Sequence, residues 1–202
     1  MKSLFIIILV STSLAGGLNP ENHSNAFEAT YGCLQYSTKD GCRPYLSTNR
    51  FKHLKTTENG VTIMRMGVMA GEGPHIRLSK IEYPFDVKIN EIVLSAWNNT
   101  ASEMRSYIPK TGGGIGEYQL LKRINSPGLL SQFYPMMFTI EIDQKGNVKL
   151  IKDGEHVPLV EFLDPNISFE YMTFCNYMVP ATFFFDCPLE IDRRDCSGVV
   201  FS

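Results

Sequence analysis

This chain of 202 residues has little of what several common function classes require. It contains no Cys-x-x-Cys, and its four histidines (His23, His53, His75 and His156) are scattered, so no metal site is predicted. It has no run of basic residues, and 19 Lys and Arg against 21 Asp and Glu leave the net charge at −2. That balance disfavours nucleic acid or an anionic membrane as the main partner, since both need concentrated positive charge.

Long hydrophobic runs are also absent, but one short run lies at the start. Lys2 supplies an early positive charge, residues 4–10 are apolar, and Ser13 and Ala15 are small residues at the two positions that a signal peptidase reads. The run is far shorter than the roughly 20 residues that span a bilayer. We therefore predict a signal peptide over residues 1–15, no membrane span and a secreted, extracellular protein.

Five cysteines remain, and most should pair in an oxidising compartment. Cys33 and Cys42 enclose the turn signal Asp40-Gly41, which makes them the first predicted disulfide. Cys187 and Cys196 form a second candidate pair, while Cys175 opposite Cys187 across a hairpin is a competing arrangement. Sequence alone leaves the odd thiol unassigned, with Cys175 the unpaired member in the first scheme.

Three sites fit the N-glycosylation pattern, at Asn22, Asn98 and Asn166. Asn22 lies in a polar leader and is the strongest candidate. Asn98 follows Trp97, and we expect it to be more enclosed.

The polarity of the chain divides it into regions. Residues 16–57 are polar and irregular and are predicted to be a disulfide-tied N-terminal extension, and residues 189–202 form a C-terminal tail. Between them, residues 58–188 alternate short β-branched and aromatic runs with Gly, Pro, Asn and Asp, which predicts an all-β, antiparallel, jelly-roll-like β-sandwich. We expect strands at residues 61–69, 75–79, 90–97, 103–108, 118–123, 136–142, 147–151, 158–162, 167–175 and 181–187.

The clearest alternation lies in residues 136–142. Met136, Phe138, Ile140 and Ile142 share one side of the expected strand, which predicts one buried face. Turn signals at Asp143–Gly146 and at Asp153-Gly154 make residues 136–162 a predicted meander.

Two segments carry a resemblance to a known family. The first is Gly73–Ser79, with His75-Ile76 and Leu78-Ser79, and the second is Glu91–Thr100, with Glu91-Ile92-Val93, Trp97 and Asn99-Thr100. They resemble strands of the farnesoic acid O-methyltransferase-like domain of invertebrate proteins, and the likeness extends from about Gly60 to about Cys187. The family name implies an isoprenoid methyltransferase, or a carrier of farnesoate or a juvenile-hormone-type lipid.

The residues themselves do not favour catalysis. A methyltransferase that uses S-adenosylmethionine typically has a glycine-rich turn between a strand and a helix. The one glycine cluster, Gly112–Gly116, is followed by Glu117, lacks the Gly-x-Gly-x-x-Gly spacing and is better interpreted as a loop between strands. No Gly-x-Ser-x-Gly occurs either. We therefore predict no cofactor and no catalytic residue.

A polar and aromatic set offers a binding function instead. Trp97 can act as a platform for the apolar face of a sugar, with polar groups from His75, Asn99, Thr100 and Arg105 around it. Alternatively, Trp97 anchors the core and Asn99-Thr100 shapes the turn after it. A third interpretation is a lipid cavity between the Met- and Phe-rich inner faces (Met64, Met66, Met69, Met136, Phe138, Phe183 and Phe185). A non-catalytic module that recognises carbohydrate is the leading prediction, with a small hydrophobic ligand as the alternative.

Overall fold

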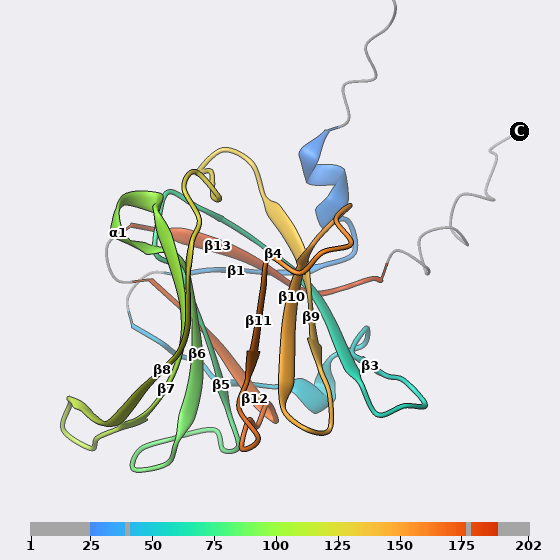
Figure 1. Ribbon diagram of the computed structural model, residues 1–202. Coiled ribbons are helices and arrows are strands. Elements are labelled where there is room, and N and C mark those ends of the chain that lie inside the picture. The colour runs from blue at the N-terminus through green and yellow to red at the C-terminus, as the bar shows by residue number, and fades with distance from the viewer. Residues whose placement is uncertain (1–24, 39–40, 177–178, 190–202) are drawn as a thin grey trace, which may run out of the picture.

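The computed structural model describes residues 25–38, 41–176 and 179–189, which form two antiparallel sheets packed face to face (Figure 1). The predicted β-sandwich is confirmed. The signal peptide, Asn22, Cys196 and residues 190–202 of the predicted tail lie outside the described residues. Within the described part of the chain, no helix is long and apolar enough to cross a membrane.

Sheet A takes its strands from both ends and the middle of the domain. Its order is β1 (Leu34–Ser37), β13 (Ala181–Cys187), β4 (Thr62–Ala70), β9 (Met136–Ile142), β10 (Asn147–Lys152) and β11 (Val160–Leu163). The short strand β3 (Lys55–Thr56) pairs with the start of β4. Strands β9, β10 and β11 are consecutive neighbours, which confirms the predicted meander.

Sheet B carries the residues of the candidate site described below. Its order is β2 (Leu46–Ser47), β12 (Tyr171–Cys175), β5 (His75–Ser79), β6 (Ile89–Ser95), β7 (Ala101–Pro109) and β8 (Ile115–Asn125). The remaining elements are two 3₁₀ turns, η1 (Ala26–Thr30) and η2 (Thr48–Arg50), and the four-residue turn α1 (Ala96–Asn99) between β6 and β7.

The core lies between the sheets and follows the predicted alternation. Met136, Phe138, Ile140 and Ile142 of β9 are all buried, and rings meet across the sandwich, as where Phe174 of sheet B stacks on Phe183 of sheet A at 4.6 Å between centroids. Six of the seven Met and Phe residues expected inside belong to this core. The prediction is wrong for Met69, which packs with Met137 and Phe184 on the opposite face of sheet A because its neighbour Val68 takes the inner position.

The turn between β9 and β10 forms as its sequence predicts. The Asp143 carboxylate accepts hydrogen bonds from the backbone N–H groups of Lys145 and Asn147. Gly146 has φ of 85°, and a Cβ there would lie 2.1 Å from the Asp164 carbonyl oxygen, so only glycine fits.

The disulfides correct the predicted pairing. Cys33 bonds to Cys187 and Cys42 bonds to Cys175, so Cys33–Cys42, Cys187–Cys196 and Cys175–Cys187 are all wrong. Strand β1 carries the chain away from Cys33 along β13, which separates Cys33 from Cys42. Cys175 ends β12 in sheet B while Cys187 ends β13 in sheet A, so no hairpin joins them.

The described part of the N-terminal segment is tied by both disulfides, which join it to β13 and β12 and do not close the predicted loop within the segment. It also supplies β1, β2 and β3, which pair with β13, β12 and β4 and which the sequence did not reveal. The segment is thereby held against both sheets, and two disulfides are consistent with an extracellular environment.

Candidate functional site

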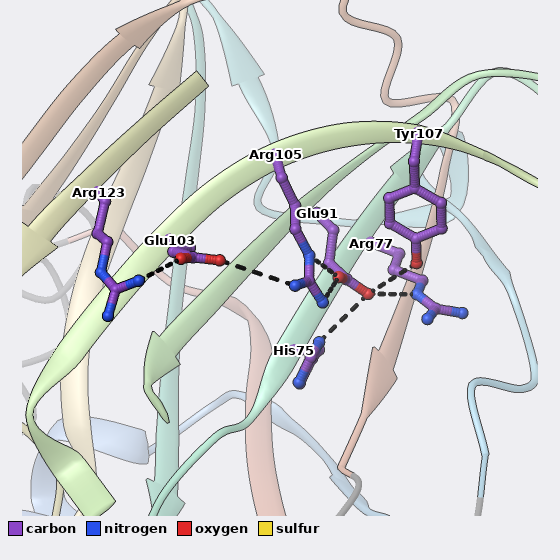
Figure 2. A network of polar contacts seen from close by, with 7 residues as sticks. All are labelled: His75, Arg77, Glu91, Glu103, Arg105, Tyr107 and Arg123. Atoms are coloured by element: carbon purple, nitrogen blue, oxygen red, sulfur yellow. Dashed lines mark hydrogen bonds and ion pairs between the residues drawn. The ribbon is translucent and has the colours of Figure 1, made fainter. Parts of the chain in front are cut away.

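A group of charged side chains covers the outer face of sheet B, the face turned away from the core. Ile76, Ile92 and Met104 belong to the core, so the residues that alternate with them along β5, β6 and β7 point outward. These outward residues and one from β8 form what we call the Glu91 network: His75, Arg77, Glu91, Glu103, Arg105, Tyr107 and Arg123 (Figure 2).

Strand register brings the network together. Arg77 on β5 and Arg105 on β7 lie directly opposite Glu91 on β6. Glu103, two residues before Arg105 on β7, lies opposite Arg123 on β8. Opposite charges on adjacent strands stabilise such cross-strand pairs.

Glu91 is the centre of the network, and its side chain is fully buried. Its Oε1 accepts hydrogen bonds from Arg77 Nε at 2.6 Å and Tyr107 Oη at 3.0 Å, and His75 Nδ1 lies 3.2 Å from it. Its Oε2 accepts from Arg105 Nε at 2.6 Å. A carboxylate with so many donors holds its neighbours in place and is not available as a general base.

These contacts decide the ionisation of the network. Burial raises the pKa of the Glu91 carboxyl, but the contact with His75 and the positive charges of Arg77 and Arg105 outweigh burial and hold the pKa far below its ordinary value. Burial lowers the pKa of Arg105, but the charge of Glu91, the hydrogen bond to Glu91 and smaller contributions from Tyr107 and Tyr118 together raise it by more. Glu91 is therefore a carboxylate and Arg105 a cation over the whole physiological range.

The network extends to the tryptophan. Arg105 Nη1 lies 3.8 Å from Glu103 Oε2, and Arg123 Nη1 donates to Glu103 Oε1 at 3.1 Å. The Arg123 guanidinium carbon then lies 4.3 Å from the centre of the Trp97 ring, within cation–π range. A continuous chain of charges thus joins buried Glu91 to Trp97.

Trp97 lies in a strained turn. Ser95, Trp97, Asn98 and Asn99 all have positive φ, between 48° and 57°. The left-handed region is unfavourable by about 1–2 kcal/mol each for residues such as Ser95 and Trp97, whereas asparagine visits it more readily. Such strain concentrates at functional sites, where the surrounding structure maintains it.

The predicted site residues divide into two roles. Trp97 is 47% exposed, so the interpretation as a core anchor is wrong. Asn99 instead shapes the turn, since its side-chain amide donates to the Leu130 carbonyl and its Oδ1 accepts from the Leu130 N–H. Thr100 closes the turn by donating to the Trp97 carbonyl at 2.6 Å. His75 and Arg105 belong to the Glu91 network. Arg105 is connected to the Trp97 ring through Glu103 and Arg123.

Asn98 differs from expectation, because it is exposed and not enclosed. Its backbone N–H donates to Glu72 at 2.7 Å. Asn166 is exposed as well. Glycosylation at Asn98 and Asn166 stays a prediction.

The sequence did not single out Arg77, Glu91, Glu103, Tyr107 and Arg123 as site residues. A signal for them was present, because polar residues at positions 75 and 77 alternate with apolar 76 and 78. Glu91 is likewise a charged residue in a strand otherwise rich in Ile, Val and Leu. An acidic residue in such a strand requires a buried partner.

Comparison with known families agrees with the resemblance of the two sequence segments. A family model described as farnesoic acid O-methyl transferase matches residues 40–189. The chain belongs to this family. As a member of the farnesoic acid O-methyltransferase family, it has the Trp97 turn and the Glu91 network inside the matched region, together with β2 but not β1.

Comparison with solved structures gave distant likenesses. A LamA variant from Z. galactanivorans, in complex with laminaritriose and laminaritetraose, has a TM-score of 0.34 at 9% identity, over 77% of each chain. LamAcat from Zobellia galactanivorans scores 0.33 at 10% identity, over 79% of this chain and 97% of that one. A mutant of HCR/D scores 0.34 at 11% identity, over 82% of this chain and 47% of that one. Comparison with curated proteins gave no match.

The family name implies a methyl donor, and the glycine cluster at residues 112–116 does not fit one. The glycine cluster forms the hairpin between β7 and β8, with Lys110 N–H bonded to the Gly114 carbonyl, so it leads from strand to strand and not into a helix. This agrees with the predicted loop. Gly112, Gly113 and Gly114 have nothing within 4 Å of a Cβ position, so no second wall faces them. We derive no methyl transfer from this site.

Proposed function

We propose that this member of the family is a secreted, non-catalytic recognition module that binds carbohydrate or glycoconjugate at Trp97 on sheet B. The observation that carries the proposal is an exposed indole ring held in place from two directions. The strained turn fixes its backbone, and Arg123 lies against the ring.

Such rigidity favours binding. A ring that is already ordered loses little conformational freedom when a ligand stacks on it, so more of the contact energy appears as affinity. The sugar would place its apolar face on the indole, and Arg123 would remain to donate hydrogen bonds to hydroxyl groups.

The test is binding of the mature protein to an array of immobilised glycans, with Trp97→Ala as the variant. Trp97 is exposed, so its removal should leave the fold intact, and we expect at least tenfold weaker binding because one aromatic stacking surface is lost. Tyr31→Ala is the matched control, since Tyr31 is 84% exposed and its neighbours Ala29 and Cys33 pack against sheet A. Unchanged binding by a folded Trp97→Ala protein would remove Trp97 from the site, and no binding to any glycan would overturn the proposal.

Two further measurements address secretion and catalysis. Full-length chain expressed in an invertebrate cell line should appear in the medium with Gly16 as its first residue.

Calorimetry with S-adenosylmethionine should show no binding. Binding that substitutions at Gly112–Gly116 abolish would replace the recognition module with a methyltransferase.

A further inference from the structure

A second feature of sheet B is a pocket at one end of its outer face, where the loop after β5 forms part of the wall. We call it the Arg43 pocket. Its volume is about 280 Å³, and its walls include Arg43 and Cys42 from the N-terminal segment, Tyr83 and Phe85 from the loop after β5, Pro109 from the end of β7, and Arg77 from the Glu91 network.

The pocket is positively charged. Among the described residues that line it are two arginines and no Asp or Glu. Arg77 is paired with Glu91, but the network as a whole contains three arginines for its two glutamates (Arg77, Arg105 and Arg123 against Glu91 and Glu103). The field inside the pocket therefore favours an anion.

Arg43 is positioned by two aromatic rings. Its guanidinium carbon lies 5.7 Å from the centre of the Tyr83 ring and 5.5 Å from that of Phe85. No carboxylate in the described part of the chain pairs with it. A guanidinium presents a planar fork of donors that matches a carboxylate, so this side chain is suited to one.

The chain is anchored to sheet B on both sides of Arg43. Cys42 is bonded to Cys175 at the end of β12, and Thr173 of the same strand donates to the Pro44 carbonyl at 2.7 Å. Residues 42–44 are thereby fixed to sheet B on either side of Arg43. This wall of the pocket is preformed, which lowers the cost of binding.

Size and chemistry then limit the ligand. A volume near the lower end for small-molecule pockets admits a single ring. Tyr83 and Phe85 offer apolar contact to such a ring, and Arg43 offers a partner for a carboxylate.

We propose that the Arg43 pocket binds a hexuronic acid unit, a sugar ring that carries a carboxylate, so that the glycans this protein recognises are acidic. This inference rests on the proposed carbohydrate recognition and names the class of sugar. The sugar ring contacts Tyr83 and Phe85, and its carboxylate pairs with Arg43 beside the positive charge of Arg77.

The test is to titrate the mature, disulfide-bonded protein with D-glucuronate at neutral pH and to measure the binding affinity by NMR. D-Glucose is the matched neutral sugar and acetate the matched anion without a ring. We expect glucuronate to bind at least tenfold more tightly than either, and Arg43→Ala to weaken that binding about tenfold or more because a charge-assisted hydrogen bond is lost. Arg43→Lys should fall between the two, since lysine keeps the charge and loses the fork.

The control variant is Arg50→Ala, which removes the same charge from an exposed residue outside this pocket and should change binding by less than twofold. Equal binding of glucose and glucuronate would overturn the requirement for an acid and leave carbohydrate recognition standing. Acetate binding as tight as glucuronate binding would overturn the sugar, and an unaffected Arg43→Ala variant would overturn the site. Absence of glucuronate binding would overturn this inference, while Trp97-dependent binding to the glycan array would still support the proposed function.

Discussion

At the scale of single residues, the side chain that organises the outer face is Glu91. It is fully buried, and Arg77, Arg105 and Tyr107 all donate to it. The substitution Glu91→Gln leaves two arginines without their anion in a largely buried site. We expect it to lower the free energy of unfolding by about 3–5 kcal/mol, measured by urea denaturation, because breaking a buried ion pair has that magnitude. Glu155→Gln breaks the exposed Lys152–Glu155 pair and should stay within about 1 kcal/mol.

The pH dependence of stability gives Glu91 a distinctive signature. Its pKa is lower in the folded protein than in the unfolded chain, so the unfolded state binds the proton more readily. The stabilisation is therefore present above the ordinary glutamate pKa and is lost as pH falls through and below it. Wild type should lose stability steadily below about pH 5, and Glu91→Gln should lose less over the same range. Parallel curves for the two proteins would contradict the central role of Glu91.

At the scale of elements, the turn α1 between β6 and β7 depends on the side-chain contacts that hold it. Its residues have unfavourable backbone angles, and Asn99 holds it through two hydrogen bonds to the backbone of Leu130. Asn99→Ala removes both, and we expect a loss of about 1–3 kcal/mol in urea denaturation because partly buried backbone groups are left unsatisfied. Glycan binding at Trp97 should weaken with it. Asn98→Gly is the control, since the Asn98 contact to Glu72 is made by the backbone N–H and glycine accepts the positive φ of 57° at this position. Equal effects of the two substitutions would contradict the anchoring role.

How far the sequence predicts these elements depends on their length. Strands β5, β9 and β13 begin and end where the sequence predicts, because a proline directly precedes each of them and Asp143 and Pro188 follow β9 and β13. Strands β1 and β3 have mostly exposed side chains that do not alternate between buried and exposed, so the sequence pattern does not predict them as strands. The pairing of Arg77 and Arg105 with Glu91 depends on which strands are neighbours, and the alternation within one strand does not contain that information.

At the scale of the whole molecule, the two disulfides connect the first part of the domain to its last strands. Cys33–Cys187 spans 154 residues and Cys42–Cys175 spans 133. The predicted local pairing failed because it assumed that nearby cysteines meet, whereas the sheet in which each strand lies decides the partner. Trypsin cleaves after Lys39 and chymotrypsin at Phe183–Phe185, so a digest without reduction separates all four cysteines. We expect mass spectrometry to find linked peptides for 33–187 and 42–175, and a 33–42 peptide would contradict the fold of the N-terminal segment.

Removing each disulfide separates its effect on stability from its effect on function. The double variants Cys33→Ser with Cys187→Ser and Cys42→Ser with Cys175→Ser should each lose about 2–5 kcal/mol of unfolding free energy, since both bonds close long loops of similar length. Their effects on binding should differ. Only Cys42–Cys175 fixes the residues beside Arg43, so only its removal should weaken glucuronate binding while the protein remains folded. Equal loss of glucuronate binding in both variants would indicate that the Arg43 pocket depends on overall stability and not on the local anchor.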